Sequence, residues 1–149
     1  MARFRFRLQT LRRLREIHRD EQRARLATAY EAERILTAQR EGVIAETAAL
    51  ADSQRQLMQQ GALDVTLLLA SQRYKQALEA QIRTLTEQAA KLAEEVERRR
   101  QTLVEADREV RVLDKLEERK RDLHREASQR AETKVLDEVA STRWEAAEL

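Results

Sequence analysis

The sequence contains no cysteine, no proline, only two glycines and 3% aromatic residues. Without cysteine it can form neither a disulfide framework nor a thiolate metal site, which is compatible with a reducing compartment. Without proline and with little glycine, almost nothing interrupts a regular backbone. Bulky side chains are too few to fill a globular core, and no apolar run approaches the length of a membrane span. These absences leave an extended helical protein or a disordered one.

Charge of one sign is also lacking, although charged residues make up 38% of the chain. The formal net charge is only +2, so no global field would steer nucleic acid toward the protein. Between Arg98 and Arg125 acidic residues interleave with basic ones, which is typical of a solvated coiled-coil surface and not of a nucleic-acid-binding stripe. We therefore expect no nucleic-acid partner. One segment is uneven: six arginines and no acid occur between Met1 and Arg15.

The stretch from Leu78 to Leu113 carries the clearest pattern in the chain. Its apolar positions follow one another at alternating steps of four and three: Leu78, Ile82, Leu85, Ala89, Leu92, Val96, Leu103, Ala106, Val110 and Leu113. Only Arg99 breaks the series. This spacing is the seam of a coiled coil, and it needs a partner helix. A composition dominated by Ala, Glu, Leu, Arg and Gln favours long helices over disorder.

A single break divides the chain into two predicted helices. We expect a first helix over about residues 4–58, a turn at 59–64 and a second helix over about 65–146, all within one domain spanning 1–149. Gly61 suits the left-handed position after a helix, and Asp64 can cap the next helix. The first helix has a line of every seventh residue from Leu8 to Leu57, and a weaker companion line from Phe4 to Glu46. The predicted fold class is all-α: a long two-helix antiparallel coiled-coil hairpin whose second helix is the longer.

Folding back at the turn aligns the two seams, with facing residue numbers that sum to about 121. The predicted layers pair Leu36 with Leu85, Val43 with Leu78, Ala29 with Leu92, Ala32 with Ala89, Leu11 with Val110 and Leu8 with Leu113. The irregular positions also match, since Arg99 would face Gln22 and Glu46 would face Lys75. This agreement favours an intramolecular hairpin over a parallel dimer.

The second helix is expected to outrun the first by about 30 residues at its carboxyl end. An apolar stripe continues there through Leu116, Leu123, Ala127, Val135, Leu136 and Val139. Such a stripe indicates an external partner. A frayed, solvated helix is the alternative.

No catalytic constellation is evident in the sequence. His18 and His124 are the only histidines and belong to different predicted helices, away from metal-ligand spacing. A two-helix hairpin offers no enclosed pocket, so we expect a non-enzymatic protein with no metal and no cofactor. The arginine-rich start has three interpretations: a transit peptide, a membrane-surface helix, or the end of a hairpin that enters an acidic or carbonyl-lined cavity. We favour the third, because Phe4 and Leu8 would continue the helical seam.

Three segments together resemble the flagellar export protein FliJ family of bacterial type III export. They are Phe4-x-Phe6-x-Leu8-x-x-Leu11-x-x-Leu14-Arg15-Glu16, Gln72-Arg73-Tyr74-Lys75-Gln76-Ala77-Leu78-Glu79-Ala80-Gln81-Ile82, and Lys115-Leu116-Glu117-Glu118-Arg119-Lys120 followed by Leu136-Asp137-Glu138. Their order and spacing resemble the family over essentially the whole chain.

The resemblance implies a protein similar to the central stalk of a rotary ATPase, within the machinery of flagellum assembly, motility and chemotaxis. The end with both termini would insert into the hexameric ring of the export ATPase, with contacts from Phe4, Arg5, Leu123 and Val135. The hairpin tip would reach the cytoplasmic domain of the export gate, and export chaperones would be further partners. The gate-contacting face would comprise Tyr74, Leu78, Gln81, Leu85, Val43, Glu46 and Leu50. A cytoplasmic location follows, peripherally attached to the inner membrane at the flagellar base.

Two other functions remain open at this point. One is the equivalent stalk of a virulence-type secretion system, although the Phe4-x-Phe6-x-Leu8 start favours the flagellar version. The other is a structural coiled coil that self-assembles through its unpaired end.

Overall fold

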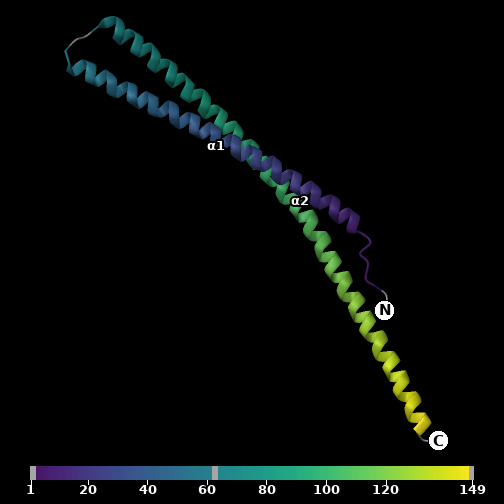
Figure 1. Ribbon diagram of the computed structural model, residues 1–149. Helices are drawn as coiled ribbons and strands as arrows, with labels where there is room; N and C mark the ends of the chain where they lie inside the picture. The colour runs from purple at the N-terminus through teal and green to yellow at the C-terminus, as the bar shows by residue number, and fades with distance from the viewer. Residues whose placement is uncertain (1–2, 62–63, 148–149) are drawn as a thin grey trace. The chain divides into compact units, whose positions relative to one another are not determined.

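The structure is a computed structural model that describes residues 3–61 and 64–147. Two helices make up the fold, α1 (Gln9–Gln59) and α2 (Val65–Ala147), and the described residues contain no strand (Figure 1). The predicted all-α fold class, with two helices that pack against each other and a longer second helix, is confirmed. The chain divides into two units. One comprises Glu21–Leu103, and the other comprises the chain up to Asp20 together with the chain from Val104 onward.

The unit Glu21–Leu103 is the hairpin proper, in which α1 and α2 run antiparallel on either side of the turn (Figure 1). Its core consists of two clusters along the predicted seam. Leu26, Ala29 and Val96 form one, with Leu103 packed against it. Val43, Leu78 and Leu85 form the other, with Leu36, Leu50 and Ile82 packed against it. The heptad pattern of α2 is therefore confirmed, because each seam position in this unit is buried or half-buried.

The predicted companion line of the first helix is wrong. Its members Ala32 and Glu46 are exposed, as is Leu11 in the other unit, so the predicted layers Ala32–Ala89 and Leu11–Val110 do not form. The second line of α1 lies one residue further along and includes the buried Leu26 and the half-buried Glu33. These positions follow the main line at the steps of four and three that a coiled-coil seam requires.

Two predicted polar pairs are also replaced by other partners. Arg99 donates one hydrogen bond to Glu95 and another, of 2.7 Å, to the backbone carbonyl of Arg25. Glu46 accepts a hydrogen bond from the Tyr74 hydroxyl in place of the expected pairing with Lys75. In both cases the side chain reaches a group beside the seam, where it remains partly hydrated and therefore avoids the desolvation of a buried charge.

The turn has the predicted chemistry on both sides of its break. Gly61 adopts a positive φ of 71°, the left-handed conformation that favours glycine after a helix. Asp64 accepts a hydrogen bond of 2.9 Å from the backbone N–H of Thr66, which satisfies a free donor at the start of α2. Ala62 and Leu63, also assigned to the predicted turn, lie outside the described residues.

The other unit contains the start of α1 and the carboxyl part of α2. Helix α1 begins at Gln9 and not near Phe4 as predicted. Arginines at positions 3, 5 and 7 would place positive charge at the positive end of the helix dipole, and the first turn contains no acid to offset it. The non-helical backbone instead lets Phe6 bury its ring, in the unit that also buries Ala106, Val110 and Leu113.

Candidate partner-binding surfaces

The amino-terminal segment, residues 3–8, lies against α2 through its two phenylalanines. The Phe4 ring meets His124 edge-on, with ring centroids 5.7 Å apart, and the Arg121 guanidinium lies 5.8 Å from the Phe4 ring centroid. Phe6 is 5% exposed. Both rings are thus used within the protein, which removes most of the apolar surface that a membrane-surface helix would need.

An ion-pair network holds the first turns of α1 to α2 beside this segment. Arg12 Nη1 donates to Glu117 Oε2 over 2.6 Å, and Arg12 Nε lies 2.7 Å from Asp114 Oδ1. Partial burial acts to lower the pKa of Arg12, but the carboxylates of Asp114, Glu117 and Glu16 outweigh it and raise this pKa. One turn further along, Arg15 donates to Glu109 over 2.9 Å. This network fixes where the segment meets α2.

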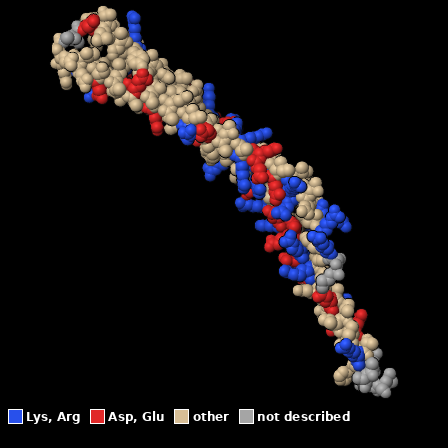
Figure 2. All heavy atoms as spheres, viewed as in Figure 1, with Lys and Arg blue, Asp and Glu red and all other residues tan. Residues whose placement is uncertain are grey.

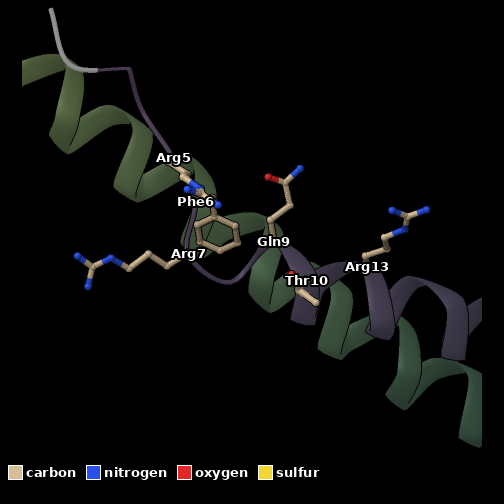
Figure 3. Close-up of a pocket in the computed structure, with 6 residues that line it drawn as sticks. All are labelled: Arg5, Phe6, Arg7, Gln9, Thr10 and Arg13. Carbon is tan, nitrogen blue, oxygen red and sulfur yellow. The ribbon is translucent and has the colours of Figure 1, made fainter.

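The arginines of the segment face outward around a surface hollow of about 580 Å³. Figure 3 shows its lining, in which Arg7 and Arg13 extend away from the Phe6 ring; the lining residues are Arg5, Phe6, Arg7, Gln9, Thr10 and Arg13. Arg5 is exposed, as its predicted role in contacting a partner requires. Cationic side chains held around a fixed ring form a surface suited to carboxylates or backbone carbonyls of another protein.

Beyond this network α2 continues without packing against any described part of α1. Every residue from Gln129 to Trp144 is exposed, and the last half-buried position is Ser128. An apolar hollow follows the helix from His124 to Leu136 and includes Val135, which is 58% exposed. Leu123, predicted to contact the same partner, is 57% exposed. The two α2 residues predicted for ring contact are therefore accessible, while Phe4 is half-buried.

The residues predicted to face the export gate divide into two groups in the hairpin unit. Leu78, Leu85 and Val43 are buried in one cluster, and Leu50 packs against it. The exposed residues are Tyr74, Gln81 and Glu46. The hydrogen bond to Glu46 is the first cause that raises the pKa of the Tyr74 hydroxyl above its usual value. Only this second group can offer functional groups to a partner from the hairpin as it stands.

Sequence reasoning did not single out Phe6, Arg12 and Glu117 as positions that organise the amino-terminal end. Phe6 falls outside the helical heptads because its backbone is not helical. Arg12 falls on the second line of α1, where an arginine gives no apolar signal. A charge-based search pairing the acid-free start with the acids of residues 109–118 would have found the network.

Signs of catalytic or membrane-spanning function are not found in the described residues. Residues 3–61 and 64–147 contain no group of three or more His, Cys, Asp or Glu placed to hold a metal ion. Neither helix, over its described length, has an apolar segment sufficient to cross a membrane. The accessible features are exposed apolar and cationic side chains on helices.

Fold and surfaces together define a two-helix coiled-coil protein that acts by offering helical surfaces to partners. The family model described as Flagellar FliJ protein matches residues 4–149, essentially the whole chain. The protein belongs to the FliJ family. It is therefore a component of the flagellar type III export apparatus, and a structural one, not an enzyme. No curated protein and no solved structure gives a significant match to the chain.

Proposed function

We propose that the protein is a stalk of the export apparatus, whose end with both termini inserts into the export ATPase ring and promotes assembly of the hexamer. The observation that carries this proposal is the continuous exposure of α2 from Gln129 to Trp144, with Val135, Leu136 and Val139 open to a partner. A regular helix with exposed apolar side chains gains by burying them in another protein.

The basic amino-terminal segment supports the same role. Arg5 is exposed and Phe4 is anchored to α2 near Leu123, so cationic and apolar groups occur in one unit. In the proposed complex Arg5 meets acidic or carbonyl groups of the ring, while Leu123 and Val135 fill apolar sites. Phe4 contributes chiefly by positioning Arg5.

The hairpin unit provides the proposed link to the export gate. Tyr74, Glu46 and Gln81 form the contact surface, and Leu78, Leu85, Val43 and Leu50 support it from within the seam. Export chaperones are a further proposed class of partner. Attachment to the inner membrane at the flagellar base would then follow from the apparatus itself, with the protein on the cytoplasmic side.

The test measures ATP hydrolysis and ring assembly by the same organism's export ATPase, with the full chain and with a version that ends at Ser128. This truncation removes only exposed α2 residues and leaves the Arg12 network and the Phe4–His124 contact in place. We expect the full chain to stimulate both readouts and the truncated chain to lose the effect. No stimulation by a folded full-length protein would overturn the proposal.

A matched pair of point variants separates a specific contact from a general loss of apolar surface. Val135 and Val112 are both valines of α2 that are 58% exposed. Val135→Ser should lower stimulation about tenfold if this side chain fills an apolar site at the interface, whereas Val112→Ser should leave it unchanged. Equal effects of the two substitutions would remove Val135 from the interface.

Self-assembly is the second candidate function, because the same exposed stripe could be buried against another copy of the chain. Sedimentation over a range of protein concentrations distinguishes the two. Oligomers that depend on residues 129–149, together with no effect on the ATPase, would favour the self-assembling coiled coil.

A further inference from the structure

The end of the hairpin carries an exposed apolar surface that the seam does not explain. Between Arg55 and Arg73 the sequence has a single charged residue, Asp64, in a chain in which 38% of residues are charged. We call the exposed apolar residues of this stretch the apolar tip; they are Leu57, Met58, Val65, Leu67, Leu68 and Leu69. Figure 2 shows this end of the hairpin mostly in tan, with few charged atoms.

These side chains lie beyond the part of the hairpin that they could help to hold together. The nearer core cluster extends only to Leu50 and Leu78. Between that cluster and the tip, Gln54 donates a hydrogen bond to the Ser71 hydroxyl and forms a polar layer. Val65 is 67% exposed and Leu69 56% exposed, so neither contributes much to packing within the chain.

The distribution of the apolar tip around the helices indicates what kind of partner it fits. Consecutive helix positions point about 100° apart, so Leu67, Leu68 and Leu69 face different sides of α2. Leu57 and Met58 add apolar surface from α1. A groove in a protein covers one face of a helix. A surface that is apolar on several sides and nearly uncharged is complementary to a medium that surrounds it, as the interior edge of a lipid bilayer does.

The charged residues at this end are placed consistently with a lipid surface. The Asp64 carboxylate accepts the N–H of Thr66 at the positive end of the α2 dipole, which offsets its charge. Arg55 and Arg73 bound the uncharged stretch, and both are exposed. Long arginine side chains at such a boundary can reach phosphate groups while the residues between them enter the apolar region.

We propose that the apolar tip inserts into the headgroup and upper acyl region of a bilayer that contains anionic lipid, with Arg55 and Arg73 at the level of the phosphates. The insertion is shallow, since neither described helix has an apolar segment that could cross a membrane. The proposal does not depend on the ATPase or the export gate. Its experiment uses vesicles alone, so its failure would leave the stalk function untouched.

The experiment places a fluorescent reporter in the tip of the full-length chain. Val65→Trp in a Trp144→Phe background provides a single tryptophan at the most exposed of these positions. Vesicles of phosphatidylethanolamine and phosphatidylglycerol are added, and then vesicles with brominated acyl chains. We expect a blue shift and quenching by bromine. An emission spectrum that vesicles do not change, and that bromine does not quench, would overturn the proposal.

Matched double substitutions test whether the tip itself drives binding, with vesicle flotation as the readout. Leu67→Ser with Leu69→Ser should lower the partition coefficient about tenfold or more, because two leucines no longer leave water. Val104→Ser with Val112→Ser removes two comparably exposed apolar side chains elsewhere on α2 and should leave partitioning unchanged. Circular dichroism checks that both variants fold. Equal losses in the two variants would contradict insertion by the tip.

Two further outcomes separate lipid from other partners. Arg73→Gln should weaken binding to anionic vesicles and leave the weaker binding to phosphatidylcholine vesicles unchanged, which would support phosphate contact at the boundary. If vesicles leave the tip reporter unchanged while the purified cytoplasmic domain of the export gate shifts it, the tip binds protein and the lipid proposal is wrong.

Discussion

Arg12 donates a 2.6 Å hydrogen bond to Glu117, a residue that is far away in the sequence and lies on α2. The same carboxylate accepts from Arg121 over 2.7 Å, and the Arg121 guanidinium lies 5.8 Å from the Phe4 ring centroid. One largely buried carboxylate, with a side chain 15% exposed, therefore joins the first turns of α1, the carboxyl part of α2 and the amino-terminal segment.

The first prediction concerns this carboxylate. Glu117→Ala leaves Arg12 and Arg121 without their shared acceptor and should lower the free energy of local opening by about 1–3 kcal/mol. Hydrogen exchange of backbone amides in residues 3–20 measures the change. Glu118→Ala, at the exposed neighbouring position, is the control. Similar exchange in both variants would show that the ion pairs do not hold the segment in place.

The second prediction separates stability from partner binding with two leucines of α2. Leu78 is 3% exposed in the hairpin core, so Leu78→Ala should lower the free energy of unfolding by about 2–4 kcal/mol. Leu123 is 57% exposed, so Leu123→Ala should change that free energy by less than about 0.5 kcal/mol. Urea denaturation measures both. In the ATPase assay the order should reverse once both proteins are folded, and a large loss of stability in Leu123→Ala would contradict its free exposure.

The third prediction concerns the one charged residue in the α2 seam. Arg99→Leu extends the apolar series, and the Arg25 carbonyl that loses a donor can still take part in the α1 helix, so stability should rise by about 1 kcal/mol. Arg99→Ala removes the contacts without filling the seam and should lower it. Thermal unfolding compares the two variants with the parent. A destabilised Arg99→Leu protein would show that the hydrogen bonds to Glu95 and Arg25 outweigh apolar packing.

The sequence predicted one helix better than the other for a physical reason. The α2 seam consists of apolar side chains at local spacing, so periodicity alone identified residues such as Val96 and Leu113. The second line of α1 includes Arg12, Glu33 and Gln54, which are half-buried through ion pairs, hydrogen bonds or their long stems. Apolar periodicity cannot detect such a line, and the exposed Leu11 and Ala32 offered a misleading substitute.

The candidate surfaces were predictable to different degrees. Exposure of Leu123 and Val135 follows from an apolar stripe that has no matching length of α1 opposite. The path of the amino-terminal segment does not follow from local pattern, because it depends on the contact between Phe4 and His124, which are distant in sequence. The predicted start of the first helix failed for the same reason: burial of Phe6 and repulsion among arginines outweighed helical continuity.

The fourth prediction follows from the hydrogen bond between Tyr74 and Glu46. This bond raises the pKa of Tyr74, so it favours the neutral phenol in the folded protein. Its contribution to stability is fully present below the ordinary tyrosine pKa and is lost as the pH rises through the raised one. A tyrosinate absorbance titration in a Tyr30→Phe background should give a pKa above the model-peptide value of about 10. Glu46→Ala should return it toward that value. An unchanged pKa in Glu46→Ala would show that the bond does not persist in solution.

The fifth prediction uses the two glycines, which have opposite backbone roles. Gly42 lies inside α1 with no atom within 4 Å of an added Cβ, so Gly42→Ala should raise the free energy of unfolding by about 0.5–1 kcal/mol through helix propensity. Gly61 also has open space around it, but its φ of 71° strains any residue with a Cβ. Gly61→Ala should therefore lower the free energy of unfolding by about 1 kcal/mol. The same substitution thus acts with opposite signs at two uncrowded positions, and urea denaturation of the pair isolates the backbone term. If Gly61→Ala proved as stabilising as Gly42→Ala, the turn would not require the left-handed conformation at this residue, and the capping argument for the hairpin would be wrong.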